Sequence, residues 1–227
     1  MRGFIRGLIV LHRAFRSRDI RTRLHALVRF LTCPFLRVLP YVPSGARVLD
    51  VGAGHGVFSV LAADRGARVV AVEPDARKAP WDGYEVTGLR GRNPVTPQLR
   101  NHFVAGYDDV VRGTFDVVAI NDVLYKIPLT EWDAFLTRAR ERLRDGGMLL
   151  VKEHDPTARL KNAWNRAQES LATMLSLTMG ESFSYETPSA FIARLQRAGF
   201  GQIEAKRIDF GYPHAHMLYV ARTSRPN

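Results

Sequence analysis

Short apolar runs alternate with amphipathic stretches through most of the chain, from about residue 46 to residue 222. Such alternation is typical of strands that are linked by helices in a parallel α/β sheet. The apolar runs, and therefore the expected strands, lie at residues 46–51, 68–73, 101–105, 115–120, 147–153, 202–210 and 215–222.

Helical periodicity fits the segments between these runs, at residues 57–65, 130–144, 157–177 and 187–198. Asp155 and Thr187 precede the last two segments and are favoured N-cap residues, each followed by a proline suited to the first helical position. The last two strands are joined by a turn at residues 211–213, which predicts an antiparallel pair. Residues 80–100 are rich in glycine and proline and predict a loop or a poorly formed helix.

The first 45 residues have a different pattern, that of a basic amphipathic helical arm. At about 100° per residue, one side of the first helix gathers arginines within roughly 80°, namely Arg2, Arg6, Arg13 and Arg16. The opposite side gathers Phe4, Leu8, Leu11 and Phe15. A second apolar face follows, made of Ile20, Leu24, Leu27, Val28 and Leu31, and prolines at positions 34 and 40 end the pattern.

Composition supports one sizeable core, because the chain has 227 residues and is 46% hydrophobic. We expect the arm at 1–45, one α/β domain at 46–222 with a helical cover inserted at 157–180, and a short tail at 223–227. The sole cysteine, Cys33, permits no internal disulfide, and no apolar run reaches the roughly 18 residues of a membrane span. These features favour a cytoplasmic protein and leave the oligomeric state open.

Charge concentrates in the arm. Residues 1–47 contain ten arginines and one acid, Asp19, a balance of +9, which leaves +2 of the total +11 for the other 180 residues. An arm of this kind meets something anionic or presents its arginines to water. Three interpretations stay open: a lid packed on the body, a contact of residues 1–31 with an anionic membrane at its inner face, or nucleic-acid contact or a transit peptide. The pattern argues against a secretory signal, because arginines interrupt every candidate apolar region and no small-x-small cleavage site follows.

A glycine-rich turn follows the first expected strand, in the pattern Asp50-x-Gly52-x-Gly54-x-Gly56. Glycines allow close backbone approach to a ligand, and Glu73, which ends the second strand, can accept both hydroxyl protons of a ribose. A dinucleotide fingerprint would need a third glycine where Val57 stands. The pattern therefore favours a nucleotide-type cofactor other than a dinucleotide.

Together with its context, this motif resembles the class I S-adenosylmethionine (SAM) dependent methyltransferases. Glu73 lies 21 residues after Gly52, residues 115–118 form the expected fourth strand, residues 121–128 follow it, and Gly146-Gly147 leads into the fifth strand. The resemblance implies a Rossmann-like three-layer sandwich around a seven-stranded, mostly parallel sheet with an antiparallel last strand, to which the helical arm is added. It also implies an enzyme that uses SAM.

The resemblance assigns cofactor roles to positions of this chain. The residues implied at the amino-acid end of SAM belong to the turn: Gly52, Ala53, Gly54 and Gly56. Asp50 would anchor the turn or contact SAM through water, and Glu73, followed by Pro74, would bind the ribose. Asp108 is the adenine candidate, although Tyr107 occupies the position where the family often has aspartate.

Asn121 and Asp122 would lie near the methionine moiety of SAM, since ligands bind beyond the carboxyl ends of parallel strands. A helix-capping role for either residue is the structural alternative. In the same loop, Tyr125 is a candidate substrate contact, and Lys126 stands where relatives often have histidine, so it could meet an anionic substrate.

Methyl transfer needs an acceptor held about 3 Å from the methyl carbon, and a base only if the acceptor bears a proton. His154, which follows the fifth strand, is the first candidate base, with Asp155 beside it. His214 and His216 alternate on the last strand and could form a substrate wall. No cluster has zinc-site spacing, so we expect no metal.

The acceptor is narrowed mainly by exclusion. The chain lacks the Asn/Asp-Pro-Pro-aromatic loop of adenine methylases, and Cys33 lies too far upstream to act as a cytosine methylase nucleophile. The apolar cover at 157–180 suits a small-molecule or lipid-like acceptor, and we expect methylation at oxygen. The chain also resembles bacterial methyltransferases of lipid or polyene biosynthesis. Two alternatives remain. One is an RNA methyltransferase whose arm contacts phosphates, although the nearly neutral body argues against binding of nucleic acid. The other is a non-catalytic protein with the SAM-binding fold that binds a membrane or a partner.

Overall fold

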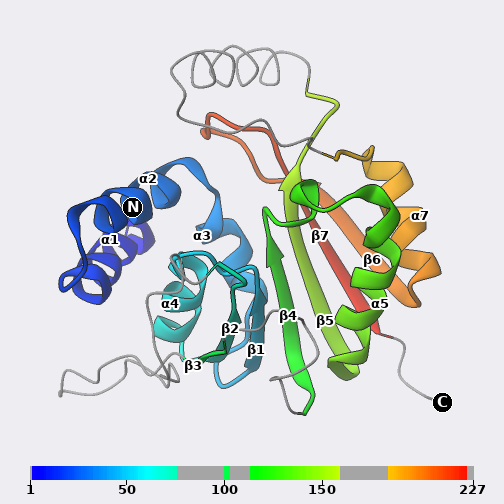
Figure 1. Cartoon of the computed structure of the whole chain (residues 1–227), viewed down its shortest axis with the longest axis horizontal. Helices are drawn as coiled ribbons and strands as arrows, with labels where there is room; N and C mark the ends of the chain where they lie inside the picture. Colours follow the sequence, from blue (N-terminus) through cyan, green and yellow to red (C-terminus); the bar gives the residue numbers. More distant parts are fainter. Residues whose placement is uncertain (1, 76–99, 103–112, 159–183, 224–227) are drawn as a thin grey trace.

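A seven-stranded sheet forms the centre of the computed structural model, which describes residues 2–75, 100–102, 113–158 and 184–223 (Figure 1). The strands are β1 (Arg47–Val51), β2 (Arg68–Val72), β3 (Arg100–His102), β4 (Phe115–Asn121), β5 (Leu143–His154), β6 (Phe200–Arg207) and β7 (His216–Thr223). Their order is β3-β2-β1-β4-β5-β7-β6. The pairs from β3 to β5 are parallel, whereas β7 runs antiparallel to both β5 and β6. The predicted seven-stranded sheet with an antiparallel last strand is therefore confirmed.

Helices cover both faces of this sheet. On one face lie α4 (Val57–Asp64) and the arm, which consists of α1 (Arg2–Phe15), α2 (Ile20–Thr32), α3 (Phe35–Val38) and the short η1 (Leu39–Tyr41). On the other face lie α5 (Trp132–Glu141) and α7 (Pro188–Arg197). Two further 3-10 turns, η2 (Leu124–Lys126) and η3 (Leu129–Glu131), connect β4 to α5. The arrangement is the expected three-layer sandwich.

Strand β5 begins earlier than the sequence pattern indicates, and the helix expected at 130–144 is correspondingly shorter. Leu143 already pairs with Phe115, and the register then shifts so that Met148 pairs with Val117. The extra residues bulge out at Gly146, whose φ is +69°. A glycine there accepts the left-handed backbone that a bulge requires, so the chain enters the sheet directly after α5 ends at Glu141.

The arm packs on the body. The sides of α1 and α2 that face it contribute buried residues to the core that α4 and the sheet share: Val10, Leu11, Phe15, Ala26 and Phe30. A Cβ on Gly7 would lie 2.6 Å from a ring atom of Phe30, so α1 and α2 pack closely on each other, and 3.7 Å from Leu61 of α4. Since α1 covers its outer side, every residue of α4 from Val57 to Ala63 is buried. The Asp19 carboxylate caps α2 by accepting a 3.0 Å hydrogen bond from the Thr22 amide.

The second apolar face predicted in the arm does not pack on the body. Ile20, Leu24, Leu27, Val28 and Leu31 are all exposed, from 41% for Leu27 to 71% for Ile20. Helix α2 is held instead through Ala26 and Phe30 on its other side. The apolar periodicity of this helix therefore marks its outward surface.

Several predicted segments lie outside the described residues. These are the helix at 157–177, most of the cover at 157–180, the loop at 80–100 apart from Arg100, residues 103–105 of the third strand, and the tail beyond Thr223. Among the residues that are described, no helix is both long and apolar enough to cross a membrane.

Packing of the arm predicts that two substitutions by alanine in α1 change the free energy of unfolding to different extents. Phe15 is 2% exposed and Ile9 is 47% exposed. Phe15→Ala should lower the free energy of unfolding by about 3 to 5 kcal/mol, because it leaves a cavity in the shared core. Ile9→Ala, the control, should change it by less than about 0.5 kcal/mol. Urea unfolding measures both, and equal small effects would mean that the arm is not part of the folded unit.

Candidate active site

A cavity of about 590 Å³ opens at the carboxyl ends of β1, β2 and β4, where ligands of open α/β sheets bind. Three parts of the chain line it: the β1–α4 turn with the residues after β2, the loop after β4, and the arm. The lining residues are His25, Arg29, Phe35, Asp50, Val51, Gly52, Ala53, Gly54, His55, Val57, Phe58, Val72, Glu73, Pro74, Asp75, Asn121, Asp122, Val123, Tyr125, Lys126, Ile127 and Phe135.

The glycine turn brings backbone to the cavity. Gly52 and Gly54 have φ values of +69° and +57°, in the left-handed region. A Cβ on Gly52 would lie 2.5 Å from Val123, so this glycine lets the β4 loop pack directly on the turn. A Cβ on Gly54 would meet no atom within 4 Å and would occupy the cavity itself. Gly56 is the N-cap residue of α4.

Glu73 is held at the edge of the turn by two backbone amides. Its Oε2 accepts from the Gly54 amide at 2.8 Å and its Oε1 accepts from the Asp75 amide at 3.1 Å. The side chain is 8% exposed and lines the cavity, next to Pro74. A carboxylate has about four acceptor positions, so Glu73 retains capacity for the hydroxyls of a ligand.

Asp50 and Asn121 form the floor of the cavity. The Ser59 hydroxyl of α4 donates to Asp50 Oδ2 at 2.6 Å, which anchors the strand to the helix that follows the turn. Burial raises the pKa of Asp50 to about 7, although the bond from Ser59 opposes this. The Asn121 amide lies beside Asp50 and lowers the pKa of that carboxyl, but its buried oxygen has no hydrogen-bond partner among the described residues and is available to a ligand.

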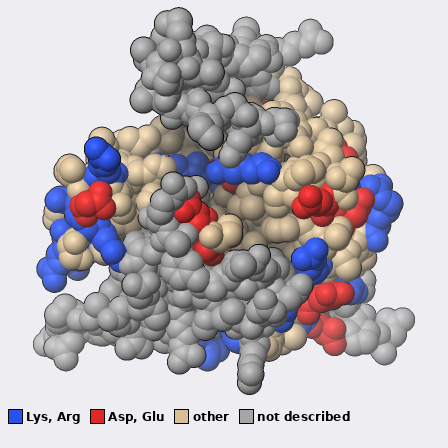
Figure 2. Space-filling view, viewed as in Figure 1, with Lys and Arg blue, Asp and Glu red and all other residues tan. Residues whose placement is uncertain are grey.

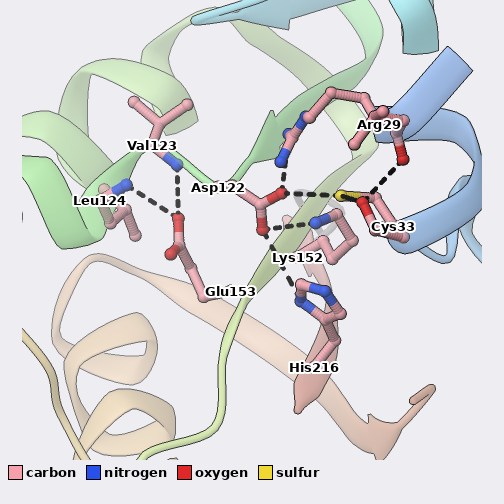
Figure 3. A network of polar contacts seen from close by, with 10 residues as sticks. Arg29, Cys33, Asp122, Val123, Leu124, Lys152, Glu153 and His216 are labelled. Atoms are coloured by element: carbon pink, nitrogen blue, oxygen red, sulfur yellow. Dashed lines mark hydrogen bonds and ion pairs between the residues drawn. The ribbon is translucent and has the colours of Figure 1, made fainter. Parts of the chain in front are cut away.

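Asp122 is the centre of a buried ionic network (Figure 3). Arg29 Nη2 of α2 donates to its Oδ2 at 2.8 Å, and Lys152 Nζ of β5 donates to its Oδ1. His216 Nδ1 of β7 lies 3.7 Å from the same Oδ1, and the Cys33 thiol lies 3.8 Å from Oδ2. Burial alone would raise the pKa of Asp122, but Lys152 and Arg29 hold that pKa well below its ordinary value. Asp122 is therefore a carboxylate at neutral pH.

Beside this network, Glu153 orders the loop after β4. Its Oε1 accepts from the amides of Val123 and Leu124, each at 2.8 Å (Figure 3). Burial, and then the charge of Asp122, raise the pKa of Glu153 to about 7. The carboxyl thus positions the residues that lead from Asp122 into Tyr125.

The predicted catalytic and substrate residues fall into two groups. Tyr125 and Lys126 line the cavity, and the Lys126 ammonium lies 5.3 Å from the centre of the Tyr125 ring. Burial raises the pKa of Tyr125, as does Asp122, so its hydroxyl remains a donor. Asp155 is 2% exposed, and its Oδ1 accepts from the Thr157 amide at 2.9 Å and the Thr157 hydroxyl at 2.6 Å, so it closes a local turn.

The other predicted residues join a cluster of rings that we call the histidine–tyrosine cluster: Tyr125, His154, Tyr185, His214 and His216. Tyr125 and Tyr185 stack at 6.3 Å between ring centres, His154 lies 5.6 Å from Tyr185 and 6.4 Å from His216, and His214 lies 6.3 Å from His216. Burial lowers the pKa of both His214 and His216. The next cause is His154 for His214 and Lys152 for His216, and each lowers the pKa further. Both imidazoles are therefore neutral at pH 7. His216 begins β7 and His214 precedes it, and neither belongs to the residues that line the cavity.

Some site residues were missed from the sequence. Lys152 lies between Val151 and Glu153 in an apolar strand and is fully buried, and a lysine in such a run signals a buried partner. Arg29 lies opposite the apolar stripe of α2, a position that the sequence assigns to solvent, so its inward contact with Asp122 gave no signal. Ser59 gave no signal either. The adenine candidate Asp108 lies outside the described residues. Within the described residues, no group of three or more histidine, cysteine or acidic side chains could hold a metal ion.

Glu153 predicts a pH-dependent difference in stability. Its folded-state pKa of about 7 exceeds its ordinary value of 4.5, so the protonated carboxyl stabilises the folded state at low pH, and this contribution is lost as the pH rises to 7. The stability of Glu153→Gln relative to the parent chain should therefore rise by about 3 kcal/mol between pH 4 and pH 8. Urea unfolding at both pH values checks this, with the exposed Glu141→Gln as control. A difference that is constant with pH would contradict it.

The geometry accommodates the cofactor that the motif implied. The free oxygen of the Asn121 amide, the open space at Gly54 and the amide-bound carboxylate of Glu73 all face one cavity. These match an amino-acid end, a close backbone approach and a ribose. The residues present therefore fit SAM.

Comparison with known proteins agrees with this fit. The profile of a family described as "Methyltransferase domain" matches residues 19–205. A probable fatty acid methyltransferase of Mycobacterium tuberculosis is 32% identical over 114 residues, 49% of this chain and 26% of that protein. A ribosomal protein L11 methyltransferase of Pelotomaculum thermopropionicum is 36% identical over 124 residues, 53% of this chain and 36% of that protein. The matches thus span only about a quarter to a third of these relatives.

A solved structure shows the same fold. The 1,6-didemethyltoxoflavin-N1-methyltransferase of Burkholderia thailandensis, with S-adenosylhomocysteine bound, superposes with a TM-score of 0.59 at 15% identity, over 85% of this chain and 79% of that one. At 15% identity, the likeness to this structure shows the fold alone. The family is shown by the profile match, which covers most of the sequence. The chain therefore belongs to the methyltransferase domain family, and its fold is that of a class I SAM-dependent methyltransferase.

Proposed function

We propose that the enzyme methylates an apolar or lipid-like small molecule at an oxygen atom. The observation that supports this most is the apolar and aromatic part of the cavity wall: Phe35, Phe58, Val123, Ile127 and Phe135. Such walls are typical of sites for apolar ligands that a few polar groups orient. The partial relative from M. tuberculosis, a probable fatty acid methyltransferase, is consistent with this class of acceptor.

In this proposal the cofactor is held by the residues around the glycine turn. Glu73 accepts the ribose hydroxyls, with Pro74 beside it. Asn121 and Asp122 meet the amino-acid end together with the backbone of the turn at Gly52, Ala53, Gly54 and Gly56. When bound, SAM supplies a methyl group on a positively charged sulfur, which needs no further activation by the protein. The contribution of the chain is to align the acceptor and exclude water.

Proton removal falls to the histidine–tyrosine cluster. With SAM bound, His154 would take the hydroxyl proton of the acceptor as its oxygen is methylated. His154 is the proposed base because it ends β5 beside Tyr185, which stacks on the cavity residue Tyr125. Tyr125, kept protonated, donates a hydrogen bond to the acceptor, while His214 and His216 form the wall behind it.

Lys126 provides the cavity with a cationic side chain close to Tyr125. In the proposal it contacts an anionic group of the acceptor, such as a carboxylate, and leaves the proton transfer to His154. Asp155 supports His154 indirectly, because its bonds to Thr157 fix the chain just beyond the strand end.

An apolar acceptor would concentrate in a membrane, so the proposal includes a peripheral location at the inner face of an anionic membrane, reached through residues 1–31. The arginine-rich arm also favours a second candidate, RNA methylation with the arm on phosphates. Incubation of the protein with labelled SAM and either a total lipid extract or total RNA separates the two. Label in a lipid product supports the proposal, whereas label in RNA alone would overturn it, and the absence of SAM binding in calorimetry would indicate a non-catalytic protein.

Glu73→Ala should weaken SAM binding by at least about tenfold, because loss of a charged hydrogen-bond acceptor costs about 1.5 to 3 kcal/mol. Isothermal titration calorimetry measures the affinity. The control is Glu204→Ala, on the exposed strand β6, which should leave affinity unchanged. Affinity of Glu73→Ala within twofold of the parent chain would remove Glu73 from the SAM site.

His154→Gln should lower turnover by about 10² while SAM affinity stays the same, because only proton transfer is affected. The pH profile of kcat should also lose its acidic limb. Turnover is measured with labelled SAM and the methylated lipid fraction. A loss smaller than tenfold, or an unaltered pH profile, would reduce His154 to a positioning residue.

A further inference from the structure

The outward face of α2 is unusual for a surface helix. Its exposed side presents a continuous apolar stripe, made of Ile20, Leu24, Leu27, Val28 and Leu31. At about 100° per residue these five side chains fall within an arc of roughly 100°. Ala26 and Phe30, on the inward side, are each 2% exposed and fix the helix on the body. The stripe is thus held facing away from the core, as expected of an interaction surface.

A groove continues the stripe between α1 and α2. Its volume is about 360 Å³, and it shares Ile20, Leu24 and Leu27 with the stripe. Leu8, Leu11, Phe15 and Ala26 form the remainder of its apolar wall, and His12 and Arg23 are its polar lining residues. The arm therefore offers both a convex and a concave apolar surface, with positive charge at the rim.

Arginines border this surface on α2, where Arg21 and Arg23 are exposed and flank the stripe. Other exposed arginines of the arm, Arg2, Arg13 and Arg16, lie on the side of the first helix that faces away from the leucines of the groove. Figure 2 shows basic side chains gathered around the arm, at the left of the view. The one acid of the arm, Asp19, already accepts bonds from the Thr22 amide and hydroxyl. The surface is apolar at its centre and strongly cationic at its border.

We propose that the stripe and groove of the arm dock on an anionic phospholipid bilayer, with acyl chains against the apolar residues and lipid phosphates at the arginines. An amphipathic helix that lies in the membrane interface combines these two features. A second copy of the chain fits less well, because a symmetric contact would place each arginine border against its equivalent. Nucleic acid would use the arginines but leave the apolar stripe in water.

This docking surface and the cavity share one helix. The side of α2 opposite the stripe contributes His25 and Arg29 to the cavity wall, and Arg29 binds Asp122. Docking would therefore hold the cavity close to the bilayer, where an apolar acceptor resides. This last step rests on the proposed lipid-like acceptor, whereas membrane binding itself does not.

Vesicle flotation of the full 227-residue chain tests the docking surface. Vesicles of phosphatidylcholine alone are compared with vesicles that contain phosphatidylglycerol, each at low and high salt. The chain should float with the anionic vesicles and release at high salt. Each arginine near an anionic membrane surface strengthens partitioning roughly fivefold, so Arg21→Gln combined with Arg23→Gln should weaken it by about 30-fold. The matched control combines Arg138→Gln with Arg222→Gln, two exposed arginines of the body, and should leave partitioning unchanged.

The apolar part is tested by Leu24→Gln combined with Leu27→Gln, which should weaken partitioning at least tenfold, with Leu129→Gln in η3 as the control. Both altered leucines are exposed, so unfolding does not confound the result, and urea unfolding verifies this. Failure of the parent chain to float, or equal losses in variant and control, overturns the proposal. A dimer in sedimentation velocity that Leu24→Gln and Leu27→Gln dissociate, without flotation, assigns the face to a second copy. Flotation requires neither SAM nor acceptor, so its failure leaves the methyltransferase activity untouched.

Discussion

The ion pairs of Asp122 join the parts of this molecule that form its cavity. A buried carboxylate is tolerated only where opposite charges and hydrogen bonds compensate for its lost hydration. Here the compensation comes from Arg29 in the arm and Lys152 in β5, while Asp122 itself follows β4. The three groups come from different segments of the chain, and removal of Asp122 would leave the positive charges of Arg29 and Lys152 without their shared partner. The network thereby ties the arm to the carboxyl edge of the sheet.

Asp122 also has a positive φ of 58°, in the left-handed region that residues other than glycine seldom adopt. The backbone turns sharply at this position, and the amides of Val123 and Leu124 then point to Glu153. The turn brings Val123 against Gly52, which has no side chain to obstruct it. One polar network, one left-handed residue and one glycine thus place the cofactor turn and the β4 loop on the same cavity.

Local pattern was sufficient for much of the fold. Alternating apolar runs predicted the strands, and the acid, glycine and strand spacing from Asp50 to Gly147 predicted the family. Boundaries were wrong where long-range pairing decides them, as at β5, where the pairing of Leu143 with Phe115 extends the strand. In the arm the apolar period of α2 was found correctly, but periodicity does not indicate which neighbour a helical face meets.

The glycine turn, the acid that follows β2 and the strands themselves follow from residues close together in sequence, because a short turn needs specific backbone conformations and a strand needs a local apolar run. The order of the strands was implied by the resemblance to the family. The sequence by itself therefore determined the fold and the methyl donor. Residues separated by dozens of positions meet in two places: Arg29, Asp122 and Lys152 in one, and His154, His214 and His216 in the other. The outward direction of the α2 stripe likewise depends on how the arm packs on the body. Only the tertiary structure decided these, because burial and charge pairing depend on which segments the folded chain brings together.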